Sequence, residues 1–361
     1  MLFQKTLIIG LGLIGGSFAR ALRQANVSKE IFAYDADEEV MDFAKNDGVI
    51  DEVILLQENL SEFDFIILSA PLSSYEEIFE EISNRVSSKA TILDLGSIKN
   101  FKIKNLPKNF IPCHPIAGSD KTGFENSKAD LFLDKKFIIC PENSEKNSLE
   151  KLEKVIKRIG AKPEFLEAKK HDEIYALVSH LPQFLSFLTA EFSPKNIEDE
   201  FFKTAFRLDN SSPELWEDVF AMNAGNLEKF YLEFFERLEK NVNLVESGKD
   251  VILSLSKDDC SSTKSESSFD KLRMTLEDKL KMTLGKNEKF FEQNFPAIFF
   301  RALVAKSYLE IPKIKTFQNY AGTGFTDFTS ITKILNHDPK KLRELIKKNQ
   351  NQILKIFNSI S

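Results

Sequence analysis

The chain has 361 residues, 42% of them hydrophobic, so it can form two domains of ordinary size with substantial cores. Acidic and basic residues are intermixed, and the formal net charge of −6 argues against a nucleic-acid partner, which requires a basic surface. No run approaches the roughly 18 apolar residues of a membrane span, and the N-terminal residues lack the features of a signal peptide. The three cysteines are too widely spaced for a disulfide framework or a metal site. We therefore expect a cytoplasmic protein without a membrane partner or a bound metal.

In the first half of the chain, short apolar runs alternate with segments of helical periodicity. Residues 13–25 form the first predicted helix, directly after the first predicted strand. The predicted strands cover residues 6–9, 31–34, 64–68, 91–93, 110–113, 137–139 and 163–166. This alternation predicts an α/β domain over residues 1–167, in which a doubly wound parallel sheet is covered by helices on both faces.

After residue 168 almost every segment has helical periodicity, which predicts an all-α second domain over residues 168–361. One long helix is expected at residues 171–192, with a kink at Pro182. Another is expected at residues 214–240, with Ser211 and Ser212 before Pro213 as its start signal.

Residues 247–285 stand apart, because they are rich in Ser, Lys and Asp and contain a near-tandem repeat. This composition predicts a disordered insert. A DNA stretch that encodes residues 251–257 can, on its other strand, encode the peptide at residues 269–275, so we hypothesise a translated inverted repeat. Residues 213–223 and 339–349 share one spacing pattern, which chance, a shared helix-start signal or duplication would explain equally well.

A glycine motif follows the first predicted strand and opens the first predicted helix. Gly10-Leu11-Gly12-Leu13-Ile14-Gly15 matches the G-x-G-x-x-G pattern of Rossmann-like dinucleotide-binding domains, and Asp35 lies twenty residues beyond Gly15. The helix N-terminus would bind the pyrophosphate, and the Asp35 carboxylate would accept hydrogen bonds from ribose hydroxyls and repel a 2′-phosphate. The motif therefore predicts NAD as cofactor, with Ser69 and Pro71 completing the site. The alternative is a tight turn without a ligand.

Two further loops follow strands at the carboxyl edge of the predicted sheet, where such folds bind ligands. They are residues 94–99 and residues 114–123. His114 is the candidate base for an alcohol being oxidised, because imidazole changes protonation state near neutral pH. Ser97 would bond the same hydroxyl or orient His114. Alone, a histidine before a proline at a strand end is more often structural.

One face of the predicted helix at residues 171–192 is unusually polar. By helical spacing it carries Asp172, Ala176, Ser179, His180 and Gln183. A cleft wall is the functional interpretation, and a buried polar network or an exposed stripe is the alternative. Arg207, six residues before Pro213, would by default be a surface arginine.

Together these motifs resemble the prephenate dehydrogenase family over roughly residues 5–240. The resemblance rests on the glycine motif, on residues 94–99 and 114–121, on His171-Asp172 with the run at residues 179–182, and on Arg207 with the run at residues 212–216. It implies a nucleotide-binding domain followed by a helical dimerisation domain, and hence a homodimer. It also implies NAD-dependent oxidative decarboxylation of prephenate to 4-hydroxyphenylpyruvate in tyrosine biosynthesis.

The resemblance implies residue roles as well. His114 would accept the hydrogen bond from the ring hydroxyl, Ser97 would position substrate and nicotinamide, and Arg207 would bind the ring carboxylate. The other residues expected in or near the substrate pocket are Ser179, His180, Gln183, Lys203 and Trp216.

The sequence departs from the family pattern near Arg207. The family often has an acidic residue and a threonine where Thr204 and Phe206 stand, and a second histidine where Gln183 stands. Residues 324–329 resemble the family phrase better, but Ser330 occupies the position of the arginine. These departures leave open the choice between prephenate and arogenate, and control by tyrosine.

Three other functions compete with this one. An arogenate or dual-specificity cyclohexadienyl dehydrogenase differs only in the side chain that its pocket accepts. A β-hydroxyacid dehydrogenase usually relies on a lysine in the helical domain, and the His114-Pro115 motif disfavours it. A non-catalytic NAD-binding regulator comes from a different class. The discriminating observation is whether Ser97, His114 and Arg207 surround one small-molecule-sized space.

Overall fold

The computed structural model describes residues 1–104, 106–118, 121–142, 144–247, 288–336 and 339–360. The insert predicted at residues 247–285 lies outside these residues, apart from Ser247. The chain divides into two compact units. The first unit contains Met1–Glu173 and Ser212–Asn223, and the second contains Ile174–Ser211 and the described residues from Ala224 onward. The domain boundary near residue 168 stays a prediction.

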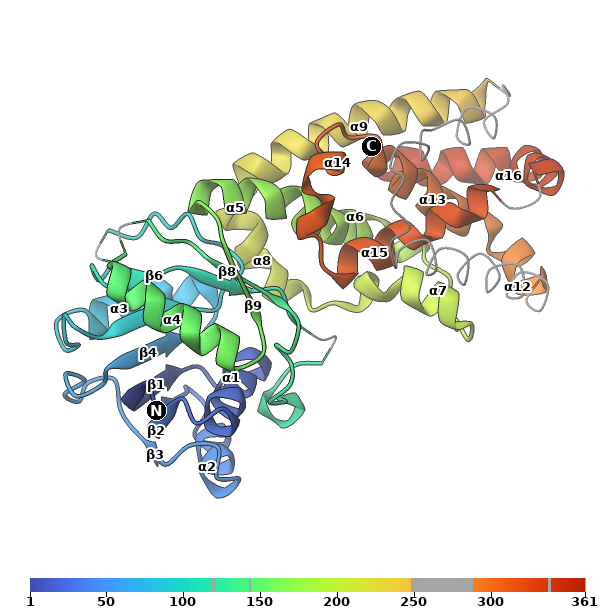
Figure 1. Cartoon of the computed structure of the whole chain (residues 1–361). Coiled ribbons are helices and arrows are strands. Elements are labelled where there is room, and N and C mark those ends of the chain that lie inside the picture. The colour runs from blue at the N-terminus through green and yellow to red at the C-terminus, as the bar shows by residue number, and fades with distance from the viewer. Residues whose placement is uncertain (105, 119–120, 143, 248–287, 337–338, 361) are drawn as a thin grey trace. The chain divides into compact units, whose positions relative to one another are not determined.

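A six-stranded parallel sheet forms the centre of the first unit (Figure 1). Its strands are β1 (Phe3–Ile9), β2 (Ser28–Tyr34), β3 (Glu52–Val53), β4 (Phe65–Leu68), β5 (Thr91–Asp94) and β6 (Phe110–Ile111), in the order β3-β2-β1-β4-β5-β6. The order reverses between β1 and β4, and Ile9, the last residue of β1, pairs with Leu68 of β4. This is the switch point at which doubly wound sheets bind ligands. The predicted fold class is therefore confirmed.

The last strands of the first unit form a separate three-stranded sheet, which the sequence did not predict. It contains β7 (Cys113–Pro115), β8 (Lys136–Ile139) and β9 (Lys162–Phe165). β7 runs antiparallel to β8, whereas β8 and β9 are parallel. The predicted strand at residues 110–113 is divided at Pro112, which has no N–H group to donate to a sheet ladder.

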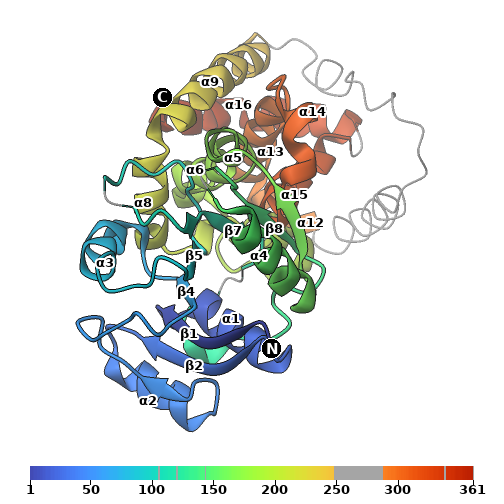
Figure 2. The same ribbon diagram turned by 60° about the vertical axis from the view of Figure 1, so that its left-hand side comes forward.

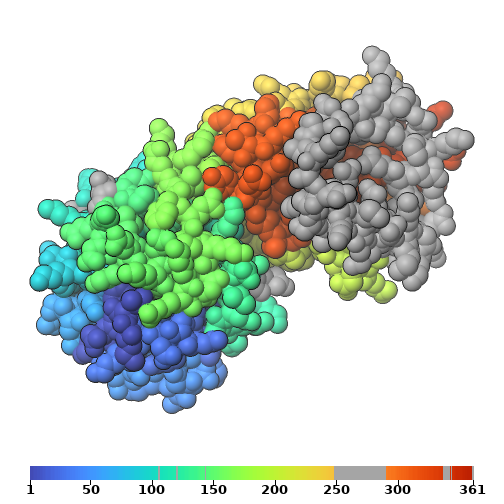
Figure 3. All heavy atoms as spheres, in the orientation of Figure 1, coloured from blue at the N-terminus to red at the C-terminus, as the bar shows by residue number. Residues whose placement is uncertain are grey.

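Helices cover both faces of the six-stranded sheet. One core cluster contains buried residues of α1 (Leu13–Gln24), α2 (Glu38–Asn46) and α4 (Lys146–Arg158), and the other contains those of α3 (Tyr75–Ile82) with Val219 of α8 (Pro213–Met222). α4 illustrates the pattern, because Leu152, Val155 and Ile156 are buried at helical spacing while Lys151 and Lys154 are exposed. The same helix lies in the green region of the first unit in Figure 3.

The second unit is helical, in agreement with the predicted all-α region. Its α-helices are the end of α5 (Ala168–Tyr175), α6 (Leu181–Thr189), α7 (Glu200–Ala205), α9 (Ala224–Glu246), α12 (Glu288–Gln293), α13 (Phe295–Leu309), α14 (Ile314–Phe317), α15 (Thr323–Ser330) and α16 (Pro339–Ile360). α13 is buried almost all round and packs against α9 and α16 (Figure 2). Among the helices of the described residues, none combines the length and apolar character that crossing a membrane requires.

The helix predicted at residues 171–192 contains a wider turn than an α-helix. A π-helical turn spans Ala176–His180 between α5 and α6, and Pro182 is the second residue of α6. Proline removes one hydrogen bond of the α-helical ladder and its ring crowds the preceding turn, so a π-turn here has a local cause. The helix predicted at residues 214–240 is divided into α8 and α9 at Asn223.

Candidate active site

The glycine loop after β1 packs against the end of β4. Gly10 has φ +96°, and a Cβ atom there would lie 2.5 Å from the Ser69 carbonyl oxygen. A Cβ atom on Gly15 would lie 2.0 Å from the Gly10 carbonyl oxygen and 3.0 Å from the Ser69 Cβ. Both positions therefore require glycine, and predicted residue Ser69 contributes the backbone against which the loop turns. Pro71, also predicted, is exposed and precedes the 3₁₀ turn Leu72–Ser74.

The middle glycine of the motif faces open space. Gly12 is exposed, and a Cβ atom on it would meet nothing within 4 Å. Gly12 is also the N-cap of α1, which begins with the predicted residues Leu13 and Ile14. The first backbone N–H groups of a helix have no partner within the helix and carry partial positive charge. A pyrophosphate can therefore approach the backbone at this point.

Asp35, directly after β2, lies beside the glycine loop. Its Oδ2 accepts a hydrogen bond from the Leu11 backbone N–H at 2.6 Å, and its Oδ1 accepts one from the Asp37 N–H at 3.0 Å. Asp35 thus holds the loop in place, a role that the sequence did not predict. Each carboxylate oxygen can accept a second hydrogen bond, so the side chain can still bind ribose hydroxyls.

A buried ion pair joins the loop that carries Ser97 to the strand that carries His114. The Lys99 ammonium donates to the Asp94 carboxylate and, at 2.5 Å, to the Cys113 carbonyl oxygen. Asp94 also accepts the backbone N–H of Cys113 at 3.0 Å. Both side chains of the ion pair are fully buried, and Ser97, which lies between Asp94 and Lys99 in the sequence, is half-buried. The network fixes the half-buried Ser97 loop relative to the residue before His114.

The protonation states of this network follow from its burial. Burial raises the pKa of the Asp94 carboxyl, and the Lys99 ammonium opposes that rise. Burial, together with the neighbouring Asp94 carboxylate, raises the pKa of Tyr75 well above its usual range. Tyr75 therefore keeps its proton near neutral pH and donates its hydroxyl to Asp94 at 3.2 Å.

His114 belongs to a chain of hydrogen-bonded side chains within the first unit. Its Nδ1 lies 2.9 Å from Nε2 of His171, and Nδ1 of His171 lies 2.8 Å from Oδ1 of Asp172. His171 and Asp172 are buried, whereas His114 is half-buried. The backbone N–H groups of Lys99 and Asn100 donate to the Asp172 carboxylate at 2.9 and 2.8 Å. The sequence marked His171-Asp172 as part of a motif but assigned it no role.

Arg207, in the second unit, is held by an acidic residue from a distant part of the chain. Its Nε and Nη2 donate to Oδ2 of Asp327 in α15 at 2.8 and 2.6 Å. The Arg207 side chain keeps 34% of its surface exposed. A guanidinium has five N–H donors, so Nη1 and one N–H of Nη2 are left to bind a carboxylate. The acidic group that Thr204 cannot supply thus comes from Asp327, within the phrase at residues 324–329.

The 3₁₀ turn Arg207–Asn210 has its own anchors. The buried Arg301 of α13 donates to Asp209 and, at 3.1 Å, to the Ser186 hydroxyl. The guanidinium carbon of Arg301 lies 5.0 Å from the centroid of the Phe206 ring. Phe206, at the position where the family often has threonine, therefore packs on a buried cation.

The remaining predicted substrate residues of the second unit differ in exposure. Ser179 and His180 end the π-turn, where Ser179 is half-buried and His180 is buried. Gln183 is buried, and its Nε2 donates to the Leu208 carbonyl at 2.8 Å, so it supports the turn of Arg207. Lys203 is exposed, and its ammonium lies 2.7 Å from the Glu200 carboxylate.

Predicted site residues are distributed over both units. Ser97, His114 and Trp216 belong to the first unit, where the Trp216 ring lies 5.6 Å from that of Phe220. The second unit contains Ser179, His180, Gln183, Lys203 and Arg207. That the two groups surround one substrate stays a prediction.

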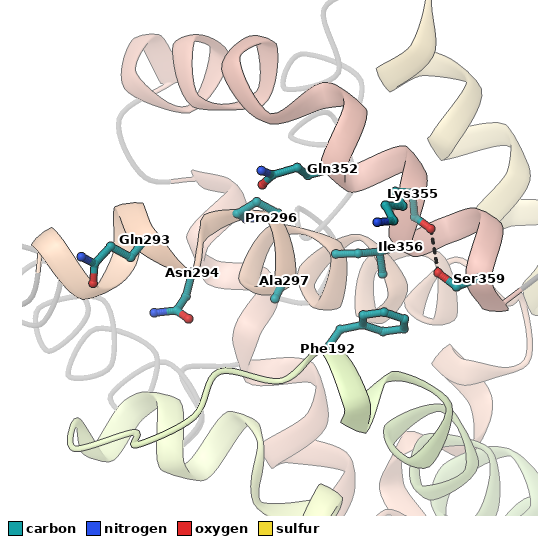
Figure 4. A pocket seen from close by; sticks show the side chains of 9 residues that line it. All are labelled: Phe192, Gln293, Asn294, Pro296, Ala297, Gln352, Lys355, Ile356 and Ser359. Atoms are coloured by element: carbon teal, nitrogen blue, oxygen red, sulfur yellow. Dashed lines mark hydrogen bonds between the residues drawn. The ribbon is translucent and has the colours of Figure 1, made fainter.

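A pocket of about 340 Å³ lies elsewhere in the second unit (Figure 4). It is lined by Phe192, by the start of α13 around Pro296, and by the end of α16 around Lys355 and Ile356. None of the predicted site residues lines it.

Both parts of the chain match family models. The model of the prephenate dehydrogenase nucleotide-binding domain matches residues 18–165. The model of the prephenate dehydrogenase dimerization domain matches residues 167–254 and 291–361. The second match is interrupted where the sequence predicts an insert.

Characterised proteins give the same family. The chain is 30% identical over 258 residues to cyclohexadienyl dehydrogenase of Zymomonas mobilis, which covers 66% of this chain and 87% of that protein. It is 30% identical to prephenate dehydrogenase of Lactococcus lactis, over 66% of this chain and 70% of that one. A crystal structure of Aquifex aeolicus prephenate dehydrogenase with hydroxyphenyl propionate and NAD⁺ is 31% identical, with a TM-score of 0.64 over 70% of this chain and 95% of that chain.

Proposed function

Because the chain belongs to the prephenate dehydrogenase family, we propose that this NAD-dependent oxidoreductase converts prephenate to 4-hydroxyphenylpyruvate and CO₂. The observation that carries the proposal is the place of His114. It lies in β7 of the nucleotide-binding unit and is connected by hydrogen bonds through His171 to the buried Asp172.

The first unit offers suitable groups for NAD. Open space at Gly12 and the N-terminus of α1 would hold the pyrophosphate, and Asp35 would accept hydrogen bonds from the adenosine ribose. The negative charge of Asp35 disfavours the 2′-phosphate of NADP. When bound, NAD supplies the acceptor for the hydride that leaves the substrate carbon.

His114 would act as the base of the reaction. Its ring takes the proton of the 4-hydroxyl group while a hydride leaves the ring carbon that carries this hydroxyl, so the alcohol becomes a ketone. The ring carboxylate then leaves as CO₂, and the electrons of the broken bond make the ring aromatic. The resulting phenolate recovers the proton from His114. A general base of this kind contributes about 10²–10⁴ to the rate.

Arg207 would bind the ring carboxylate before it leaves. Asp327 orients the guanidinium through Nε and Nη2, and the remaining N–H groups form the fork that suits a carboxylate. Ser97 would position the hydroxyl group, and Ser179, His180, Gln183, Lys203 and Trp216 would contribute to the pocket. A neutral Gln183 where the family often has histidine would alter contacts with the substrate side chain.

Arogenate is the second candidate substrate, since the Zymomonas mobilis relative is named a cyclohexadienyl dehydrogenase. Prephenate and arogenate differ in a keto or an amino group on the side chain. The test is NADH formation by purified protein with each compound at equal concentrations. We expect a higher kcat/KM for prephenate. A higher value for arogenate would reassign the substrate within the same reaction.

The proposal includes the assembly and location of the protein. The second unit matches the dimerization domain of the family, so we expect a homodimer formed through its helices. Light scattering on the purified chain measures its mass, and a monomer at working concentration would contradict this.

The location that we propose is the cytoplasm. Cys113 and Cys140 are free thiols, which suits a reducing compartment.

A further inference from the structure

The chain Asp172–His171–His114 has a preferred arrangement of protons. Both oxygens of Asp172 accept backbone N–H groups, Oδ1 from Lys99 and Oδ2 from Asn100, which favours the ionised carboxylate. An ionised carboxylate only accepts hydrogen bonds, so Oδ1 is the acceptor toward His171 at 2.8 Å. Nδ1 of His171 must then carry the proton of this hydrogen bond. In the neutral ring, Nε2 of His171 is left as an acceptor. Nδ1 of His114, at 2.9 Å, is therefore the donor.

We infer that His171 and Asp172 are positioning residues that keep His114 in the tautomer protonated on Nδ1. Only this tautomer leaves Nε2 of His114 unprotonated and able to take a proton from an alcohol. The inference deepens the proposed function and rests on the assignment of His114 as its base. Neither His171 nor Asp172 touches the reacting atoms in this scheme.

The surroundings keep the arrangement rigid. Asp172 accepts two backbone N–H groups through its carboxylate, and its own carbonyl accepts the Asn223 side-chain amide at 2.8 Å. Lys99 is one of the two backbone donors, and its ammonium donates a hydrogen bond to the carbonyl of Cys113, the residue before His114. His171 has no exposed surface and Asp172 has 3%, so water does not compete for their hydrogen bonds.

The same chain stabilises His114 after proton transfer. The substrate O–H bond breaks, and the proton forms a bond to Nε2 of His114. The imidazolium then donates its Nδ1–H to His171, whose opposite nitrogen donates to the Asp172 carboxylate. A positive charge on His114 is thus stabilised through His171 by a buried carboxylate, as in other histidines oriented by a second residue.

The first test compares two variants of His171. His171→Leu fills the space without an acceptor, whereas His171→Gln offers an amide oxygen to Nδ1 of His114. We expect kcat to fall about 10–100-fold in H171L, by analogy with the loss when the hydrogen-bond partner of a metal-ligating histidine is removed. H171Q should recover much of that loss, and both variants should keep the wild-type KM for prephenate and the wild-type Kd for NAD. Equal losses in the two variants, or a loss confined to KM, would contradict the inference.

A double-mutant cycle separates positioning from a general structural effect. If His171 acts through His114, H171L in an H114N background should leave kcat at the value of H114N alone. If the two losses multiply, His171 acts independently and the inference is wrong. Inactive wild-type protein would instead count against the proposed function, so the two failures are distinguishable.

The tautomer can also be measured without any substrate. The chain has only four histidines, so ¹⁵N spectra of protein labelled at histidine can be assigned through single substitutions. In the neutral ring of wild-type His114, we expect a protonated Nδ1 and an unprotonated Nε2. H171L should increase the population protonated on Nε2. Wild-type His114 protonated on Nε2 would overturn the inference whatever the substrate.

Discussion

At the scale of single residues, the chemistry of His114 depends on its neighbours. A histidine before a proline at a strand end is a common structural feature. Here the ring is connected through His171 to a buried carboxylate, with hydrogen bonds of 2.9 and 2.8 Å. Those contacts fix ring orientation and proton position together, which suits a base that must act in one direction.

His114→Asn tests the base directly. Asparagine keeps a polar side chain but cannot take up a proton, so we expect kcat to fall by about 10²–10⁴. The Kd for NAD should change little, because Gly12, Asp35 and α1 are unaffected. Steady-state kinetics and a fluorescence titration with NAD measure the two quantities. Full activity in this variant would remove His114 from its assigned role.

Arg207→Gln tests the carboxylate site. A hydrogen bond to a charged group is worth about 1.5–3 kcal/mol, so we expect KM for prephenate to rise roughly 10–100-fold. Arg85→Gln is the matched control, because Arg85, in the turn after α3, is 41% exposed and pairs with Glu81 of α3. It should leave KM unchanged. If R207Q and R85Q gave the same KM as wild type, Arg207 would not bind substrate.

Contacts between distant residues were the part of the site that the sequence could not predict. The motifs identified His114, Ser97 and Arg207, because each stands in a recognisable local phrase. Asp327 was noted only as part of a second, similar phrase, and its bond to Arg207 joins residues 120 positions apart. A single sequence contains no signal for such a pair.

At the scale of elements, substitutions at two glycines of the loop after β1 should have different effects, one on NAD binding and the other on the stability of the fold. Gly12 has φ −70° and open space around it, so alanine fits there without strain. Gly12→Ala should keep the unfolding temperature but raise the Kd for NAD about tenfold or more, because the Cβ atom occupies the approach of the pyrophosphate. Thermal unfolding and a binding titration measure the two effects.

Gly15→Ala, in contrast to Gly12→Ala, should lower the free energy of unfolding. Its Cβ atom would lie 2.0 Å from the Gly10 carbonyl oxygen, so α1 must shift away from β1 at a cost of about 1–3 kcal/mol. Gly225→Ala is the control for both variants, since its Cβ atom would meet nothing within 4 Å and it lies in α9. Gly225→Ala should leave NAD binding unchanged.

Unaltered NAD affinity in Gly12→Ala would contradict the predicted pyrophosphate site.

Most strands were predicted close to their observed bounds, because buried parallel strands are short apolar runs with polar ends. β3 was missed, as its two residues Glu52 and Val53 give no periodic signal. The π-turn was also missed, because Ala176–His180 has the composition of an ordinary helix and Pro182 predicted only a kink. The antiparallel direction of β7 depends on the path of the chain around Pro112, which local pattern does not specify.

At the scale of the whole molecule, residues 255–285 are expected to be dispensable. The dimerization-domain match ends at residue 254 and resumes at residue 291, so the family fold forms without an equivalent of this segment. Loop length affects stability weakly, so deletion should change the free energy of unfolding by about 1 kcal/mol or less. The variant should keep the wild-type kcat/KM. Insoluble or inactive protein would show that the segment packs on the enzyme.

The division into two kinds of structure followed from sequence periodicity, because strand and helix periods differ. The grouping of α8 with the first unit did not, since Ser212–Asn223 follows helical segments of the second unit in the chain. Val219 packs in the same core cluster as the buried residues of α3, and the Asn223 side-chain amide donates to the Asp172 carbonyl. These contacts depend on three-dimensional packing, which helical periodicity does not encode.

NADH and CO₂ formation by the purified wild-type protein with NAD and prephenate tests most directly whether this chain is a prephenate dehydrogenase. We expect the two products to appear in equal amounts, and H114N to suppress both together. Folded protein that binds NAD but forms neither product, from prephenate or from arogenate, would contradict the assignment of this chain as a working dehydrogenase of its family.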